Sequence, residues 1–388
     1  MKIMLANFTK MVEDSGGMAK VTCDFANEMQ RRGHIVTLVY SDEKEGNFFF
    51  KLNQGIAKYD LRHFRGESIA FPLRLKAKRE ILRAFDTKSG RTINNDFAEQ
   101  YLLKNVKVIL KEVQPDVIVS YQPAASKLLL CDAQTKIPVI TMSHGDPEDY
   151  FHIYPDKEIP ALEKSAICQV LLPSFAQHIN NHLPQAKTVV IGNAVPQYQE
   201  QANLAQTKEH YKIVFVGRLA ERHKRPHLLV EAFAKVAADF PQWIVELWGA
   251  MDGKIYYKKL KNLISSKNLQ DRVLIKGSTN NVPSVLEQSD IFVITSAYEG
   301  FGLSLAEAMS MGLPAVGYKN CSAVNELIAD GKNGYLCDAG VDDLAGKLKL
   351  LMTDQKLRVK MGEAARLSMQ AYAPEKIWDQ WEDLLQKV

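Results

Sequence analysis

Residues 290–317 constrain the fold more than any other stretch of this sequence. The first part, 291–295, is a continuous apolar run of strand length, which is typical of a parallel strand covered on both faces. A glycine-containing turn follows, and a helix is expected over about 303–311, ended by Gly312 before a short strand at 315–317. This order predicts a β-turn-α-β unit, in which ligands collect outside the carboxyl ends of the strands.

Two glutamates lie in this unit, one in the turn and one in the helix. Glu299 stands in the glycine-rich turn, where the hydrophobic periodicity gives no reason for a carboxylate. Glu307 follows Ser304 by three residues, which is the spacing of a capping box, so a purely structural role in the first helical turn also fits it. The spacing alone leaves both interpretations of Glu307 open.

The segment resembles the E-x7-E signature of the retaining glycosyltransferases of family four, which have the two-domain GT-B fold. In that family the first glutamate faces the transferred sugar and its anomeric carbon. The second holds the ribose hydroxyls of the nucleotide, and the backbone amides after the first face the diphosphate and the sugar. The resemblance implies the two side-chain roles for Glu299 and Glu307. It implies the amide role for Phe301, Gly302 and Leu303.

A second motif begins after the strand expected at 213–216. Arg218 and Lys224 are two cations six residues apart, between a strand and a helix, and this arrangement suits the growing charge of a diphosphate leaving group. Spacing alone favours two surface cations. The run resembles the family's G-R-x5-K motif, however, which implies that both side chains contact the donor phosphates. Arg225 departs from the pattern, because a glycine is common after the lysine.

The first half of the chain offers weaker candidates. A strand at 2–6 leads to Gly16 and Gly17 at the start of a helix, where backbone N–H groups can hold a phosphate or a sugar hydroxyl, although a tight turn also explains the pair. His144 follows a strand expected at 139–142, a position that suits a cleft, although an isolated histidine is more often structural. Family members have a Gly-Gly loop and a histidine near these positions. The resemblance therefore implies contacts to the donor sugar or the acceptor.

The loop at 276–278 resembles the one that family members use to contact the nucleotide base. Those contacts run largely through backbone, so Gly277 is a candidate that does not identify the base. The chain contains no Asp-x-Asp motif, which glycosyltransferases of the other major fold use to hold a divalent ion on the diphosphate. We therefore expect no metal and no cofactor besides the nucleotide-sugar, with Arg218, Lys224 and a helix N-terminus in the place of the ion.

Length and composition suit two α/β domains. The 388 residues are 46% hydrophobic and 24% charged, and the net charge of +4 is too small and diffuse to indicate nucleic acid. The sequence has no apolar run long enough for a membrane span and no signal peptide, which predicts a cytoplasmic protein. The five cysteines are scattered, so we expect reduced and mostly buried thiols and neither disulfides nor a metal site.

The expected fold is α/β, of the GT-B type, with two doubly wound Rossmann-like domains facing each other across a cleft. Residues 1–195 would bind the acceptor, and residues 211–372 would bind the nucleotide-sugar. The stretch 196–210 is polar and aperiodic and is expected to link the domains. The amphipathic helix expected at 373–388 would cross back to the first domain, as the last helix does in the GT-B fold.

Residues 62–91 carry nine Lys and Arg but only three acidic residues, with apolar side chains interleaved. A solvated charged surface explains this composition. The alternative is a basic amphipathic surface that contacts anionic lipid on the cytoplasmic face of a membrane, or an anionic acceptor. The composition does not decide between lipid and acceptor.

The resemblance implies transfer of a hexose from a nucleoside-diphosphate sugar, with a UDP-sugar favoured, to an acceptor hydroxyl with retention at the anomeric carbon. Cell-surface polysaccharide, lipopolysaccharide or glycolipid is the expected product, and the acceptor is expected to be lipid-linked or anionic. No residue is an obvious covalent nucleophile, which favours front-face attack assisted by the departing phosphate. Two alternatives stay open: a nucleotide-sugar epimerase of the same architecture, and a non-catalytic nucleotide-sugar-binding protein. The catalytic candidates are Glu299, His144, Arg218 and Lys224.

Overall fold

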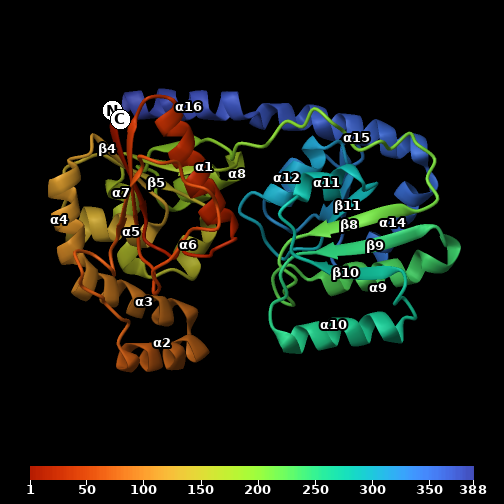
Figure 1. Cartoon of the computed structure of the whole chain (residues 1–388), viewed down its shortest axis with the longest axis horizontal. Helices are drawn as coiled ribbons and strands as arrows, with labels where there is room; N and C mark the ends of the chain where they lie inside the picture. The colour runs from red at the N-terminus through yellow and green to blue at the C-terminus, as the bar shows by residue number, and fades with distance from the viewer. The chain divides into compact units, whose positions relative to one another are not determined.

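The computed structural model describes all 388 residues, which divide into two compact units (Figure 1). Unit 1 comprises Met1–Gly192 together with Trp378–Val388, and unit 2 comprises Asn193–Ile377. Each unit is built on one parallel sheet with helices around it, as the α/β prediction requires.

Unit 1 contains a seven-stranded sheet in the order β3-β2-β1-β4-β5-β6-β7. Every strand pair is parallel, and β4 and β5 are fully buried, in keeping with their continuous apolar sequence. The strand order reverses between β1 and β4, so the switch point of this sheet lies at their carboxyl ends. The strands are β1 (Lys2–Asn7), β2 (Ile35–Tyr40), β3 (Ala57–Asp60), β4 (Val117–Ser120), β5 (Val139–Met142), β6 (Ile167–Val170) and β7 (Thr188–Val190).

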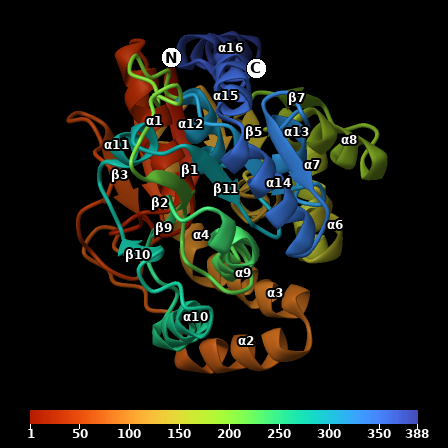
Figure 2. The same cartoon turned by 90° about the vertical axis from the view of Figure 1, so that its right-hand side faces the viewer.

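The helices of unit 1 include a pair, α2 and α3, that lie side by side (Figure 2). A Cβ on Gly90 of α3 would come within 2.9 Å of the Arg83 Cβ of α2, so a glycine permits this close packing. A π-helical segment at Ala98–Leu102 joins α3 to α4. The helices are α1 (Gly17–Arg31), α2 (Leu73–Phe85), α3 (Thr87–Phe97), α4 (Leu103–Val113), α5 (Pro123–Lys127), α6 (Glu148–His152), α7 (Ile159–Lys164) and α8 (Pro173–His182).

The last helix, α16 (Pro374–Lys387), belongs to unit 1 from Trp378 onward and packs against α1. The Phe25 ring meets Trp378 and Trp381 edge to face, with centroids 5.9 and 4.9 Å away. Arg32 forms an ion pair with Asp379 at 2.8 Å. Trp381 is 2% exposed, and burial of an aromatic ring of this size contributes about 2 to 3 kcal/mol.

Unit 2 contains a six-stranded parallel sheet in the order β10-β9-β8-β11-β12-β13, which reverses between β8 and β11. Its strands are β8 (Tyr211–Val216), β9 (Trp243–Trp248), β10 (Val273–Gly277), β11 (Ile291–Ile294), β12 (Ala315–Tyr318) and β13 (Gly334–Cys337). Its helices are α9 (Pro226–Val236), α10 (Lys254–Ser266), α11 (Val282–Glu287), α12 (Leu303–Ser310), α13 (Val324–Leu327), α14 (Asp342–Thr353) and α15 (Gln355–Met369). The expected β-turn-α-β unit is β11, α12 and β12.

The stretch 196–210 contains no helix or strand and packs onto unit 2. The Ala202 N–H donates to the Met311 carbonyl at 3.0 Å, and Lys208 forms an ion pair with the buried Asp290 at 2.7 Å. The need to pair the buried carboxylate gives a physical reason for this segment to stay on unit 2.

All five cysteines are free thiols and four of them are buried, as expected. None of the helices combines the length and the apolar character needed to cross a lipid bilayer.

Candidate functional site

The carboxyl ends of β8 and β11, the strands on either side of the switch point in unit 2, carry most of the candidate residues. The turn with Arg218 and Lys224 follows β8, and the turn with Glu299 follows β11. Because β8 and β11 are neighbours in the sheet, two motifs that are about 75 residues apart in sequence meet at one edge.

Glu299 is held by two side chains at this edge. Lys224 Nζ forms an ion pair with Glu299 Oε1, and Ser296 Oγ donates to the same oxygen at 2.5 Å. The Lys224 and Glu299 side chains are 18% and 9% exposed, so the pair is largely sheltered from water. Both contacts go to Oε1, so the other oxygen, Oε2, can accept a hydrogen bond from a ligand hydroxyl.

Arg225, the residue that departs from the family pattern, has a left-handed backbone with φ 49° and ψ 45°. This conformation explains why glycine is common at the position, because glycine adopts it without strain. The guanidinium offsets the strain by donating from Nε to the Thr295 carbonyl and from Nη2 to the Ser296 carbonyl, each at 2.9 Å. The Thr295 hydroxyl in turn donates to the Lys224 carbonyl at 2.8 Å. The two turns are therefore bonded directly to each other beside the Lys224–Glu299 pair.

A stacked pair of rings also joins these two turns. The imidazole of His223 lies against Tyr298 with centroids 4.2 Å apart and bonds through Nε2 to the Tyr298 carbonyl at 3.0 Å. Burial and the neighbouring Lys224 charge lower the pKa of His223. The Arg218 side chain is exposed at the end of β8, where a ligand can reach it.

The start of α12 presents backbone N–H groups next to Glu299. Gly302 is the N-cap, with φ 78°, and the first bond inside the helix runs from the Ala306 N–H to the Gly302 carbonyl at 2.9 Å. The N–H groups of Leu303 and the two residues after it therefore lack helical acceptors and can bind an anion. Phe301 is buried, and its ring meets Tyr372 edge to face with centroids 5.1 Å apart.

The geometry of α12 excludes the capping-box interpretation of Glu307. A capping box needs Ser304 at the N-cap, but the helix begins two residues earlier, at the left-handed Gly302, and has no side-chain cap. Glu307 is 8% exposed. Burial and the nearby Glu307 charge raise the pKa of Tyr198.

The ends of β8, β9 and β10 are joined by backbone bonds. The Gly217 N–H donates to the Trp248 carbonyl at 2.9 Å, and the Gly249 N–H donates to the Gly277 carbonyl at 2.8 Å. A Cβ on Gly249 would lie 1.9 Å from the Gly217 carbonyl oxygen, so only glycine allows this approach. Gly277, the candidate base-contact residue, has φ 77° and ends β10 at this same edge.

In unit 1, Gly16 and Gly17 lie where a helix begins, beside the end of β1. Gly17 is the first residue of α1 and Gly16 is its N-cap, with an extended backbone and no side-chain cap. A Cβ on Gly16 would meet the Asp14 carboxylate at 3.2 Å. Neither glycine has a positive φ, so what they contribute here is the absence of a side chain.

His144 follows β5 and stacks on Tyr121, which follows the neighbouring strand β4; the ring centroids are 5.2 Å apart and the planes are inclined by 12°. Its Nε2 is buried without a hydrogen-bond partner. Burial lowers the pKa of His144 to about 4, so the ring is neutral at pH 7. An unpaired nitrogen on a fixed neutral ring can accept a hydrogen bond from a hydroxyl.

The sequence interpretation missed Ser296, the guanidinium contacts of Arg225 and the ring of Tyr121. A serine three residues before Glu299 was visible in the sequence, but serines are too common for this to be a signal. The other two contacts depend on the pairing of strands, which residue spacing does not reveal.

Two family models cover nearly the whole chain. Residues 15–196 match "Glycosyltransferase Family 4", and residues 196–368 match "Glycosyl transferases group 1".

Curated relatives match parts of the chain. The poly(glycerol-phosphate) alpha-glucosyltransferase of Bacillus subtilis is 31% identical over 47% of this chain and 27% of its own length. The N-acetyl-alpha-D-glucosaminyl L-malate synthase of Bacillus anthracis is 35% identical over 42% of each chain. The matched segments therefore span less than half the length of these two relatives.

Among solved structures, a variant of TarM from S. aureus, in complex with UDP, alpha-GlcNAc-glycerol and fondaparinux, superposes over 99% of both chains. The TM-score is 0.76 at 17% sequence identity, a likeness that concerns the fold. With both halves matched by glycosyltransferase models and the whole chain matched in fold, the chain belongs to the glycosyltransferases with the GT-B fold, with a family 4 domain followed by a group 1 domain.

Proposed function

We propose that this glycosyltransferase moves a hexose from a nucleoside-diphosphate sugar to an acceptor hydroxyl, with retention at the anomeric carbon. The observation that carries the proposal is the Lys224–Ser296–Glu299 cluster at the switch point of unit 2, beside the exposed Arg218. A carboxylate and two cations lie together at one sheet edge, which supports a site for a sugar and its diphosphate.

The roles divide by charge. Arg218, Lys224 and the free N–H groups at the start of α12 bind the diphosphate and stabilise the charge that grows on it as the sugar bond breaks. Glu299 accepts hydrogen bonds from the sugar through Oε2, and Glu307 accepts them from the ribose hydroxyls. This division needs no metal on the diphosphate, so we propose a metal-independent transfer.

Retention is proposed to occur by attack on the face from which the phosphate departs. The Glu299 carboxylate is a poor candidate for a covalent nucleophile, because Lys224 and Ser296 both hold one of its oxygens and stabilise its charge. A departing phosphate oxygen can instead accept the proton of the incoming hydroxyl. In unit 1, the neutral His144 is proposed to accept a hydrogen bond from a hydroxyl of the sugar or of the acceptor.

UDP-sugars are the donors we propose, with support from the UDP-bound TarM structure. The poly(glycerol-phosphate) alpha-glucosyltransferase of Bacillus subtilis supports an acceptor in the cell envelope, such as a surface polysaccharide, lipopolysaccharide or glycolipid. The acceptor would then be anionic or lipid-linked.

Thermal unfolding with a panel of uridine, guanosine and adenosine diphosphates and their sugars tests the donor. A ligand at one hundred times its dissociation constant adds about 2.7 kcal/mol of stability. In a domain of about 150 to 250 residues, each kcal/mol raises the Tm by about 2 to 4 °C. The uridine series should give the largest shift, and the sugar should be transferred when an acceptor is supplied. Isomerisation or release of the sugar, or binding without turnover, would overturn the transferase proposal.

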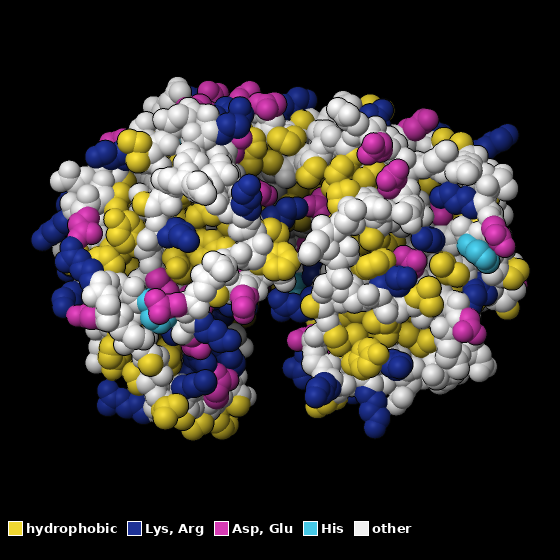
Figure 3. Space-filling view, viewed as in Figure 1, with side chains coloured by type: hydrophobic (Ala, Val, Ile, Leu, Met, Phe, Trp, Pro, Cys, Tyr) yellow, Lys and Arg dark blue, Asp and Glu magenta, His cyan; other side chains and the backbone are white.

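We propose a second contact, between α2 and an anionic membrane surface. Figure 3 shows Lys and Arg side chains gathered where α2 and α3 lie, with hydrophobic side chains among them. No residue of α2 is buried, and Leu73, Ile81 and Phe85 are 83%, 60% and 87% exposed. With Ala77 they recur every four residues and form one exposed apolar stripe.

This apolar stripe favours lipid over a soluble anionic polymer, because a polymer would not cover it. The free cations beside it are Arg74, Lys76 and Lys78, each worth about 1 kcal/mol near an anionic surface. Other basic residues of the predicted segment are engaged within unit 1. Arg62 pairs with Glu43, Arg65 with Glu112, Lys88 with Asp156, and Arg79 with Glu80.

Sedimentation with vesicles tests the membrane contact. The protein should bind vesicles that contain phosphatidylserine at low salt, and replacing Arg74, Lys76 and Lys78 by Gln should abolish the binding. The matched control replaces three exposed lysines of α10, Lys254, Lys258 and Lys261, by Gln and should bind as the parent does. Equal losses in both variants, or no binding by the parent, would overturn the proposal.

A further inference from the structure

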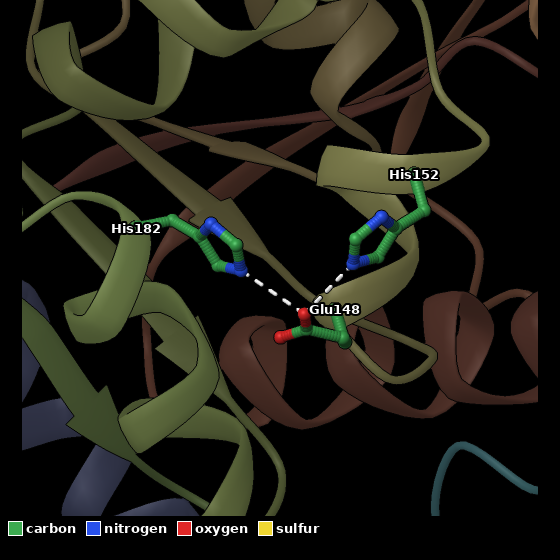
Figure 4. Close-up of side chains that lie close together, drawn as sticks. All are labelled: Glu148, His152 and His182. Atoms are coloured by element: carbon green, nitrogen blue, oxygen red, sulfur yellow. Dashed lines mark hydrogen bonds and ion pairs between the residues drawn. The ribbon is translucent and has the colours of Figure 1, made fainter.

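Three side chains of types that can ligate a metal converge on the surface of unit 1. Glu148 begins α6, His152 ends it, and His182 ends α8 (Figure 4). Both imidazole Nε2 atoms point at one carboxylate oxygen: His152 lies 2.9 Å and His182 3.0 Å from Glu148 Oε1. The three potential ligand atoms all lie within 4.8 Å of one another.

Local structure orients all three groups before any ligand arrives. Glu148 and His152 are four residues apart, so a single helical turn places them on one face. The His182 ring is stacked on Phe151, with centroids 3.9 Å apart and planes inclined by 17°.

The topology of the sheet explains how residues 30 positions apart come to meet. α6 follows β5 and α8 follows β6, and these two strands are neighbours in the sheet. Their following helices therefore start at the same edge, and the contact between α6 and α8 brings the two histidines to one carboxylate.

The geometry suits a small, tetrahedral cation. A zinc ion bound to nitrogen and oxygen at about 2.0 to 2.2 Å keeps its ligand atoms roughly 3.3 Å apart. The two nitrogen–oxygen separations are already close to that value, and the side chains are exposed enough to adjust: 63% for His152, 39% for Glu148 and 36% for His182. We propose that Glu148, His152 and His182 bind Zn²⁺ or a similar divalent cation that prefers imidazole, with water in the remaining position.

The ion would clamp α6 to α8 and would take no part in sugar transfer. The Glu148 N–H donates to Asp146 Oδ1 at 3.0 Å, and His178 of α8 bonds to the same oxygen at 2.6 Å. The ion adds a second link between the same two helices, next to the turn that carries His144. It therefore stiffens this turn without touching the residues proposed to bind the donor.

Cobalt absorption and zinc calorimetry test the site on tag-free protein that has been treated with a chelator. The parent should bind one equivalent of Zn²⁺, and Co²⁺ should give the intense visible absorption of tetrahedral coordination. His152→Gln and His182→Gln should each lower the zinc affinity by more than about tenfold, the smallest loss usual for a residue that only supports a ligand. Hydrogen exchange in 146–152 and 176–182 should slow when zinc is added to the parent.

The matched control is His210→Gln, which removes an exposed histidine beside a glutamate, Glu209, at 4.0 Å in unit 2. It should bind zinc and cobalt as the parent does. The highly exposed His152 gives the cleaner variant, and a melt without metal shows whether His182→Gln has lost stability with its ring stack. The proposal is overturned if the parent gives no tetrahedral cobalt spectrum, or if His152→Gln binds zinc within twofold of the parent.

Discussion

Replacement of Glu299 by Gln should have opposite effects on nucleotide binding and on turnover. The change removes the charge that Lys224 pairs with and keeps the size and shape of the side chain. If Lys224 binds the diphosphate as proposed, the diphosphate must compete with Glu299 for the Lys224 ammonium in the parent. In Glu299→Gln that competition is gone, so the bare nucleoside diphosphate should bind more tightly, whereas kcat should fall.

The magnitude follows from the burial of the pair. Exposed ion pairs are worth about 0 to 1 kcal/mol, and breaking a buried pair costs about 3 to 5 kcal/mol. With side chains 18% and 9% exposed, this pair lies between the two cases. Release of Lys224 to the diphosphate should therefore add about 1 kcal/mol to binding, which is roughly a fivefold gain in affinity. Loss of the charge that is proposed to face the reacting carbon should lower kcat by about 100-fold or more.

Calorimetry with the bare diphosphate and steady-state kinetics with the sugar donor measure the two effects. The unliganded variant should also melt at a lower temperature than the parent, because Lys224 is left without a partner, and the nucleotide should restore more of the Tm than it does in the parent. Asp239→Asn breaks a surface pair with Lys349 at 3.1 Å and serves as the control. A parallel loss of diphosphate affinity and kcat, or an unchanged kcat, would refute the reasoning.

Three further predictions address other parts of the two units. Glu307→Ala should weaken nucleotide binding by about 1.5 to 3 kcal/mol, the value of a charge-assisted hydrogen bond, and should change kcat at saturation less. Calorimetry that finds an unchanged nucleotide affinity would contradict the proposed contact with the ribose. Arg225→Gly and Arg225→Ala both lose the guanidinium bonds, but only glycine adopts the left-handed backbone without strain. Arg225→Gly should therefore be about 1 kcal/mol more stable than Arg225→Ala in thermal unfolding. A more stable alanine variant would contradict this account. Burial lowers the pKa of His144 from 6.5 to about 4, so the unfolded state binds the proton more readily and stability is lost as the pH falls through this window. Between about pH 7 and pH 5 the parent should lose about 1 to 2 kcal/mol more than His144→Phe in denaturant unfolding, and equal losses would argue against a buried neutral ring.

The parallel strands were predictable because each is a short apolar run between turn residues. The runs at 291–295 and 139–142 coincide with β11 and β5 to within one residue. A strand that is covered on both faces needs apolar residues along its whole length, so its sequence pattern is easy to recognise. The start of α12 was ambiguous for a related reason. A capping box and a left-handed glycine two residues earlier are both local signals, and only the backbone of Gly302 decides between them.

Side-chain pairings across the sheet were not predictable from residue spacing. Lys224 meets Glu299 because β8 and β11 are neighbours, and His182 meets Glu148 because β5 and β6 are neighbours. Strand order is a property of the whole chain, so no local pattern encodes it. The family resemblance marked Lys224 and Glu299 as separate site residues but did not predict that they pair. Glu148 and His182 had no such signal, although Glu148 and His152 show helical spacing in the sequence.

On the proposed function, donor binding at Lys224 also changes how strongly the Glu299 carboxylate accepts hydrogen bonds. Without a ligand the two charges neutralise each other, so neither of these two sheltered side chains is left unpaired. When a diphosphate draws Lys224 toward its oxygens, Glu299 keeps the hydrogen bond from the Ser296 hydroxyl, but its ion pair with Lys224 weakens. The carboxylate then becomes a stronger acceptor for the sugar hydroxyls at the moment the sugar arrives. Arg225, bonded to the Thr295 and Ser296 carbonyls, keeps both turns in place while this exchange of partners occurs.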